Sequence, residues 1–410
     1  MSDPINPQPD LKDQSAASPP IAPGILRSQL GGVFSLTSIF FINFLSRVIL
    51  APLLVTIEKE LKLSHEQAGV LFLLISAGYS LALFCSGYLS SRLVHRKAIF
   101  FSSLTLGLTM LALSVSKNLW SIRLGLFILG MCAGIYLPSG VATLTSMVRP
   151  QDWGKAISLH ELAPNISFVA APFIGQAFLY WGSWRWLMAV LGLASLVLGF
   201  NFVRSNTGGN FYGRAPTPRV VGEMLKNFSF WIIMILFALG IGTSFGIYSM
   251  MPLYMVVERG LSQGWANTLV AFSRVSGIFI ALAAGLFVDR LGLKKTMAVF
   301  LFLTGILTIL LGALHHNWLI VCVFLQPMMA VCFFPAGFTA ISRIGPPESR
   351  NVAISFTVPL GFLLGGGAVP SLIGWTGEQG SFSMGIMALG IITLACLPLI
   401  SRLRFDKTRV

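Results

Sequence analysis

The sequence of 410 residues is poor in charged side chains, and acidic residues are the rarest of them. Asp and Glu number 14 against 28 Lys and Arg, and charged residues together make up 10% of the chain. A soluble globular domain carries about 25% charged residues. Hydrophobic residues make up 55%, and the mean hydropathy is +0.80. This composition excludes a soluble globular protein and predicts an all-α membrane protein embedded in a lipid bilayer.

The sequence also lacks the motifs of enzymes and of ATP-driven pumps. It contains no Walker loop, no GxSxG or HExxH motif, and no cluster of metal ligands. The five cysteines are scattered singly through apolar segments without CxxC spacing, so we expect free thiols. We therefore predict no catalytic residues, no metal and no cofactor. Energy for any transport must then come from an ion gradient or from the gradient of the substrate itself.

Apolar segments long enough to cross a membrane follow one another along the chain. A polar stretch, 204–228, separates them into two sets of six and is predicted to be a cytoplasmic linker. We expect a disordered tail at 1–30, six-helix bundles at 31–203 and 229–403, and a short tail at 404–410. The predicted spans are 31–57, 66–92, 97–116, 118–148, 155–181, 184–203, 229–257, 264–290, 294–314, 317–343, 351–374 and 382–403.

The second half of the chain repeats the first at an offset of about 200 residues. Pro138-Ser-Gly140 corresponds to Pro335-Ala-Gly337, and Ala156-Ile-Ser158 to Ala353-Ile-Ser355. Because each half has an even number of crossings, the two copies share one orientation and are expected to pair about an axis along the membrane normal.

A basic turn closes one apolar segment in each half. In the second half, Gly292 is expected to end the helix in the left-handed conformation and Asp289 to act as a latch. In the first half, Ser91 and Val94 stand where the second copy has this Asp and Gly, which makes a charge-based latch doubtful there. The residues expected to form these gating turns are Gly87, Arg92, Arg96, Gly285, Asp289, Arg290, Gly292 and Lys294.

This pair of turns resembles the loop signature of the major facilitator superfamily, and the resemblance covers nearly the whole chain after residue 30. It implies a twelve-helix secondary transporter that alternates access between the two sides of the membrane, most simply as a monomer. Most Lys and Arg fall in the segments that this topology places in the cytoplasm, so the net charge of +14 indicates orientation and not binding of nucleic acid. Both termini are expected on the cytoplasmic side of a bacterial inner membrane.

Two arginines inside apolar segments are the strongest candidates for a binding site. Arg47 and Arg274 lie about ten residues from the outer ends of their predicted helices, one in each half, and so at a similar depth. An ionisable side chain at this depth is costly unless it is paired or binds something. Arginine can hold a carboxylate or phosphate with two parallel hydrogen bonds. We therefore predict a clamp for a small organic or inorganic anion, with an ion pair to a carboxylate of the protein as the alternative.

Other polar side chains in the spans could complete this site. Glu161, with His160, is a candidate for proton coupling, although a structural charge near a helix start is equally consistent with its position. Arg123 is placed with them by the family resemblance, or else extends toward the outer interface. Further side chains that could line the pocket, or simply pack, are Asn43, Tyr79, Tyr136, Asn165, Tyr248 and Gln326.

Two alternatives to proton-coupled anion transport remain open at this point. A proton/drug efflux antiporter would bind lipophilic cations through aromatic side chains and Glu161, but cations outnumber carboxylates in the spans. A membrane sensor or scaffold that does not transport would keep the fold and lose the cycle. The first-half turn, with Ser91 and Val94, is the one feature that favours a sensor.

Overall fold

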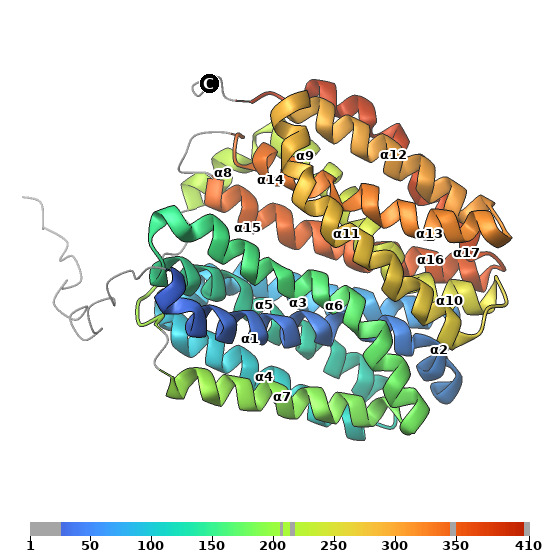
Figure 1. Cartoon of the computed structure of the whole chain (residues 1–410), viewed down its shortest axis with the longest axis horizontal. Helices are drawn as coiled ribbons and strands as arrows, with labels where there is room; N and C mark the ends of the chain where they lie inside the picture. The colour runs from blue at the N-terminus through green and yellow to red at the C-terminus, as the bar shows by residue number, and fades with distance from the viewer. Residues whose placement is uncertain (1–25, 206–207, 214–217, 345–349, 406–410) are drawn as a thin grey trace, which may run out of the picture.

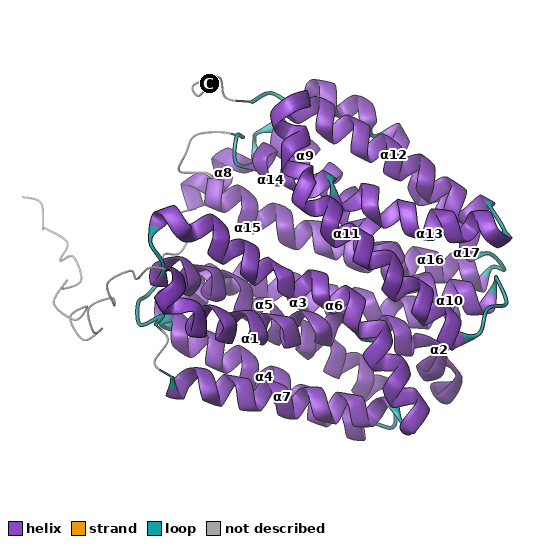
Figure 2. Cartoon of the chain, viewed as in Figure 1, coloured by secondary structure: helices purple, strands orange, loops and turns teal. Residues whose placement is uncertain are grey.

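A computed structural model describes residues 26–205, 208–213, 218–344 and 350–405 of the chain. Every regular element in these ranges is a helix, and they contain no strand (Figure 2). Eleven stretches are apolar and long enough to span a membrane, and the 29-residue helix α11 occupies the place of the twelfth. Most of the predicted N-terminal tail and residues 406–410 of the predicted C-terminal tail lie outside the described residues.

The first six predicted spans are helices whose ends lie within a few residues of the predicted ones. The first span runs to Leu61 and has a break at Ile49, so it is longer than expected and consists of two helices. A short 3-10 turn precedes it at Leu26–Gln29. The helices are α1 (Leu30–Val48), α2 (Leu50–Leu61), α3 (His65–Arg92), α4 (His95–Val115), α5 (Leu119–Met147), α6 (Trp153–Trp181) and α7 (Trp184–Arg204).

The second set begins after α8 (Pro218–Leu225), a short helix in the linker. Two of its spans contain a π-helical segment, at Gly242–Gly246 and at Phe362–Ala368. A 3-10 segment, Leu397–Arg402, follows the last helix. The helices are α9 (Phe228–Ile241), α10 (Ile247–Val257), α11 (Gln263–Leu291), α12 (Leu293–Ala313), α13 (His316–Val331), α14 (Phe333–Ile341), α15 (Arg350–Gly361), α16 (Val369–Glu378) and α17 (Phe382–Ala395).

Equivalent glycines hold equivalent helices together in the two halves. A Cβ added to Gly107 would lie 2.7 Å from the carbonyl oxygen of Gly192, where α4 crosses α7. A Cβ added to Gly390 would lie 2.8 Å from the carbonyl oxygen of Gly305, where α12 crosses α17. Close approach of small residues is a common basis of helix packing in membranes. The repeat seen in the sequence is therefore a repeat of packing geometry.

The helices of both halves run between two ends of one bundle (Figure 1). We call the end that carries α8 and the α11–α12 turn the linker face, and the end that carries the C-termini of α2 and α10 the opposite face. α6 and α11 pack together near the opposite face and diverge toward the linker face in this view. Strongly exposed aromatic side chains gather at the opposite face, as at a membrane interface: Trp120, Tyr180, Trp181, Trp186 and Trp318.

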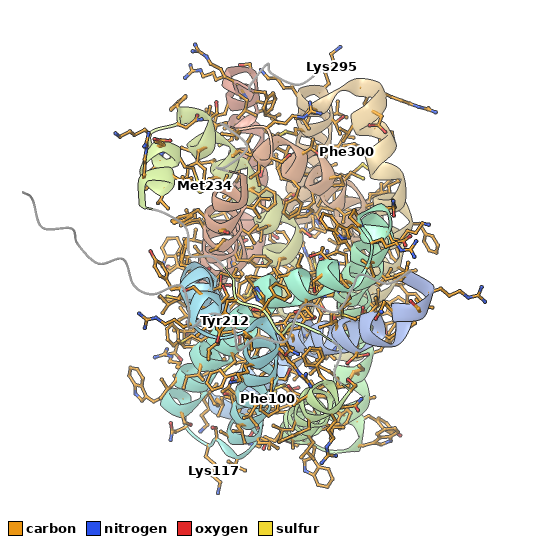
Figure 3. All side chains as sticks on the ribbon, turned by 90° about the vertical axis from the view of Figure 1, so that its left-hand side faces the viewer. Phe100, Lys117, Tyr212, Met234, Lys295 and Phe300 are labelled. Atoms are coloured by element: carbon orange, nitrogen blue, oxygen red, sulfur yellow. The ribbon has the colours of Figure 1, made fainter. Side chains whose placement is uncertain are left out.

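The linker covers the turn of the first half. The N–H groups of His95 and Arg96 donate to the carbonyl oxygens of Phe211 and Gly209, at 3.1 and 2.9 Å. The N–H of Gly213 donates to the carbonyl oxygen of Ser90 at 2.8 Å. In Figure 3, which faces the linker end, Tyr212 lies over the N-terminal half and Lys295 lies at the rim of the C-terminal half. The two copies of the turn therefore have different surroundings.

Candidate functional site

Arg47 lies near the middle of the first span, at the interface between the halves. Its guanidinium carbon is 4.1 Å from the ring centroid of Tyr79 and 4.6 Å from that of Phe44. The ring of Phe362, which comes from the C-terminal half, is 5.5 Å away. The residue is 2% exposed, and its Nε has no hydrogen-bond partner among the described residues. Aromatic faces thus surround a buried cation that lacks a full set of acceptors.

Arg274 lies near the middle of α11 and has a similar environment. Its Nη2 donates to the carbonyl oxygen of Ser244 at 3.0 Å. The guanidinium carbon lies 4.9 Å from the ring centroid of Tyr248 and 5.1 Å from that of Phe168, a residue of the N-terminal half. Its Nε is also buried without a partner among the described residues. Each arginine thus contacts an aromatic ring of the half to which it does not belong.

Six aromatic side chains connect the two arginines, and we call them the aromatic cluster. Phe44 and Phe168 are 5.1 Å apart between centroids, and Phe245 is 6.0 Å from Phe168 and 5.7 Å from Phe362. All of these pairs meet edge to face, the favoured geometry for aromatic rings. The six members are Phe44, Tyr79, Phe168, Phe245, Tyr248 and Phe362.

Neither arginine forms an ion pair with a carboxylate in the part of the chain that the structure describes. Glu161, the carboxylate that the sequence predicted for proton coupling, lies 3.5 Å from Nδ1 of His160 and forms no ion pair with either arginine. A buried cation without a counter-ion is strongly unfavourable for folding alone. The pair therefore lacks the negative charge that a bound anion would supply.

His160 belongs to a buried hydrogen-bond chain at the linker side of the aromatic cluster. The hydroxyl of Tyr136 donates to the carbonyl oxygen of Leu36 at 2.7 Å, and Nε2 of His160 is 3.0 Å from the same hydroxyl. Because that hydroxyl proton is engaged by the carbonyl, Nε2 must be the donor to the hydroxyl oxygen. Phe40 stacks on the imidazole at 4.3 Å. Nδ1 then faces the carboxylate of Glu161, whose side chain is 50% exposed.

The other residues predicted for the site bond within their own half. Asn43 donates to the carbonyl oxygen of Ala133 at 3.1 Å, and Asn165 to that of Glu161 at 2.8 Å. Gln326 donates to the carbonyl oxygen of Thr243 at 2.8 Å. Arg123 lies at the opposite face beside Trp120, 5.3 Å from its ring centroid, and not with the other two arginines. The structure therefore brings together Arg47, Arg274, Tyr79 and Tyr248, and separately His160, Glu161 and Tyr136.

The residues of the gating turns lie at the linker face. Gly292 has φ +78° and ψ 158°, so it ends α11 with a positive φ that suits glycine, but not in the left-handed helical conformation that the sequence predicted. Asp289, Arg290 and Arg92 are exposed, and Lys294 donates to the carbonyl oxygen of Ser401 at 3.2 Å. Gly87 lies in α3, Gly285 in α11, and Arg96 at the contact with the linker described above.

Hydrogen bonds between the halves lie at mid-depth or toward the opposite face throughout the described residues. Gln263 donates to the carbonyl oxygen of Pro52 and Asn267 to Oε1 of Gln176, at 3.1 and 3.0 Å. The N–H of His65 donates to Oε2 of Glu378 at 2.8 Å. Deeper in the bundle, the hydroxyl of Ser80 donates to the carbonyl oxygen of Pro359 at 2.7 Å. The opposite face is therefore sealed by polar contacts.

The sequence did not predict four of the six cluster rings as part of the site. Phe44, Phe168, Phe245 and Phe362 are ordinary residues for apolar helices, which are rich in phenylalanine. Phe245 and Phe362 lie in the two π-helical segments, and such segments occur frequently at functional sites. The run Gly365-Gly366-Gly367 within the second segment was the available signal, because glycines permit such irregular helix geometry.

Comparisons with known proteins identify the family of this chain. The profile of the Major Facilitator Superfamily matches residues 36–292 and again 262–410. A chloramphenicol resistance protein of Pseudomonas aeruginosa is 24% identical over 309 residues, 70% of each chain. The hexuronate transporter of Bacillus subtilis (strain 168) is 27% identical over 278 residues, 62% of this chain and 63% of that protein.

A solved structure has the same architecture. The inward-facing, occupied form of a bacterial homolog of the human lysosomal transporter Spinster superposes with a TM-score of 0.79 and 15% identity, over 93% of this chain and 99% of the other. Two repeated six-helix halves that meet around a central site define the class of secondary membrane transporters. The chain belongs to the Major Facilitator Superfamily, so it is a multi-pass membrane transporter and not an enzyme.

Proposed function

We propose that this transporter carries a small anion, held between Arg47 and Arg274, and couples its movement to protons. The observation that supports this most strongly is the pair of membrane-buried arginines, one from each half, without a carboxylate partner among the described residues. An anion bridging them would supply the missing acceptors and would contact both halves at once. Binding would thereby favour the conformations in which the halves close around it.

Alternating access requires the hydrogen bonds between the halves at the opposite face to break when that face opens. The hydrogen bonds of Gln263, Asn267 and Glu378 hold the opposite face closed, and we propose that this face is the outer one. The linker face would then be cytoplasmic, as the distribution of basic residues predicts. Entry from the linker side would place the solute next to Glu161, whose carboxylate is accessible there.

The proton site would be the pair of His160 and Glu161. Nε2 of His160 is committed as a donor to Tyr136, so the Nδ1–carboxylate contact is favourable only when one proton is shared between Nδ1 and Glu161. With that proton absent, a lone pair faces a carboxylate. The titratable group of a packed helix that contacts this pair is the Tyr136 hydroxyl on α5, and no ion pair joins the pair to another charged group in the described residues.

Drug efflux is the second candidate, because the aromatic cluster could accept a flat lipophilic compound and the chain is similar to a chloramphenicol resistance protein. The two candidates differ in what the arginines do. An efflux protein for neutral or cationic drugs gains nothing from two buried cations, whereas an anion carrier requires both.

Binding to purified protein tests the anion proposal. Thermal unfolding is followed with benzoate, glucuronate, inorganic phosphate and chloramphenicol, because a ligand that binds the folded state raises the apparent stability. We expect at least one anion to stabilise the wild type and to lose this effect in Arg47→Ala and in Arg274→Ala. Arg123→Ala is the matched control, since it removes an arginine outside the site, and its response should equal that of the wild type. Stabilisation by chloramphenicol alone would favour efflux instead.

A further inference from the structure

The aromatic cluster lies where a bound anion would have to place the rest of its body. Arg47 is in contact with Phe44 and Phe362, and Arg274 with Phe168. Phe245 closes the path between them through its contacts with Phe168 and Phe362. A solute held by either guanidinium is therefore surrounded by ring faces and edges.

The neutral hydrogen-bonding side chains near the rings are single hydroxyls, including Ser76 beside Phe245 and Phe362. The two members of the cluster with hydroxyls are Tyr79 and Tyr248, and the hydroxyl of Tyr248 already donates to the carbonyl oxygen of Phe168 at 3.3 Å. Asn43 and Gln326, which could have bound hydroxyl groups of a solute, are engaged with backbone carbonyls of their own halves. A sugar acid would leave several hydroxyl groups without partners, and each unpaired group lowers affinity.

The packing of the cluster also favours one shape of solute. The six rings contact one another, with centroid separations between 4.8 and 6.3 Å. A solute that enters between the arginines must replace ring–ring contacts by contacts with itself. A flat aromatic body restores edge-to-face geometry, and a polar or bulky body does not.

We infer that the substrate class is aromatic monocarboxylates, whose carboxylate is held by the two arginines and whose ring inserts into the aromatic cluster. This inference rests on the proposed anion transport and narrows it. It gives the cluster a role in selectivity, since the arginines alone accept any small anion. It also explains why the site combines two buried cations with six aromatic rings.

A ligand series on the purified wild type tests the inference. Affinities are measured by isothermal titration for benzoate, cyclohexanecarboxylate, glucuronate and inorganic phosphate, which share a negative charge and differ in the body attached to it. We expect benzoate to bind about tenfold more tightly than cyclohexanecarboxylate, as one or two aromatic pair contacts would give. Glucuronate and phosphate should bind more weakly still.

A ring-removing variant tests the role of the cluster itself. Phe245→Leu keeps an apolar side chain, and we expect it to weaken benzoate binding about fivefold while phosphate binding changes less than about twofold. If Phe245→Leu does not fold, Phe168→Leu is used in its place, because it also removes one ring of the cluster. Phe100→Leu is the matched control, because Phe100 forms a ring pair with Phe200 at 5.3 Å within the N-terminal half.

The failures of the two proposals are distinguishable. If glucuronate or phosphate binds more tightly than benzoate and requires Arg47, the anion site stands and the aromatic class is wrong. Equal binding of benzoate and cyclohexanecarboxylate, unchanged in Phe245→Leu, would also overturn the aromatic class. If none of the four anions binds, or binding is the same in Arg47→Ala, the anion site fails and the inference fails with it.

Discussion

The N-terminal and C-terminal halves derive from one repeat but carry different chemistry at equivalent positions. In α6, His160 and Glu161 form a titratable pair that reaches the linker side of the site. The equivalent residues of α15 are Thr357, which is fully buried, and Val358, which packs against the buried group of Tyr79, Leu83 and Ala133. The C-terminal half has π-helical segments in two spans instead, and each contributes one ring to the cluster.

This difference indicates how a duplicated scaffold acquires a directional function. The packing glycines are retained in both halves, so the architecture stays symmetric. Each arginine lies near the middle of a span, but the two do not occupy equivalent positions along the repeat, since one lies in the first span of its half and the other in the second. Symmetry would supply the rocking motion, and the asymmetry would supply the proposed proton site on one side of it.

Removing either arginine should have the largest effect. A charged hydrogen-bonding group contributes about 1.5–3 kcal/mol, so Arg47→Ala or Arg274→Ala should lower uptake of a bound anion into liposomes by roughly 10- to 100-fold. Stability without ligand should stay equal or rise, because an unpaired buried charge is removed. Uptake of labelled benzoate and the melting temperature measure the two quantities. A variant that loses stability and uptake together would point to a structural role for that arginine.

Glu161→Gln tests whether the carboxylate that α6 has, and α15 lacks, is the proton site. We expect accumulation driven by an imposed pH gradient to be lost, which for one proton is about tenfold per pH unit. Exchange of labelled for unlabelled substrate at equal pH should continue, because it needs no net proton movement. Glu223→Gln on α8 removes an exposed carboxylate that pairs with Arg219 and serves as control. Loss of exchange as well would mean that Glu161 acts in binding.

Much of this architecture could be predicted from the sequence because its signals are local or repeated. Span lengths follow from membrane thickness, and the helix ends agree with the predicted ones within a few residues. The two midplane arginines stand out because charges are rare in such helices. Gly292 was predictable because a helix end that needs a positive φ favours glycine.

The remaining features depend on contacts between distant parts of the chain. A phenylalanine in the cluster has the same local sequence character as one facing lipid, so Phe44 and Phe168 carried no signal. The bond between His160 and Tyr136 joins α6 to α5, and the choice of tautomer depends on a third group, the carbonyl of Leu36. The linker that covers the first turn was predicted as a linker, but its place on Arg96 and Ser90 was not.

Gly365→Ala tests the irregular geometry that the C-terminal half alone has. A Cβ at this position would lie 2.3 Å from the carbonyl oxygen of Ala238 and 2.5 Å from the nitrogen of Gly242, so the backbone must move. We expect a loss of about 1–3 kcal/mol in unfolding free energy, measured as a lower melting temperature. Gly277→Ala in α11, where a Cβ meets no atom within 4 Å, should be neutral or slightly stabilising. Equal melting temperatures would remove the case for a close-packed π-helical segment.

The smallest expected effects come from substitutions in the two copies of the basic turn, and they should differ between the copies. Asp289 lies exposed in the last turn of α11 and four residues before α12 begins, so the two helix dipoles act on its carboxylate in opposite directions, each by about 0.3–1 kcal/mol. Asp289→Asn should therefore change the transport rate by at most about fivefold. Ser91 at the equivalent position donates only to the carbonyl oxygen of Tyr88 in its own helix, at 2.8 Å. Ser91→Ala should change the rate by less than about twofold.

Rates of benzoate exchange in liposomes compare the two turn variants directly. A larger effect at Asp289 would agree with a latch that works in the second half, whereas the linker contacts stabilise the first turn. Equal effects would mean that the linker does not replace the missing charge, and that the two turns still act as a symmetric pair. Such symmetry would leave the His160–Glu161 pair and the two π-helical segments as the features that distinguish the halves, because the turns would then contribute equally to the motion.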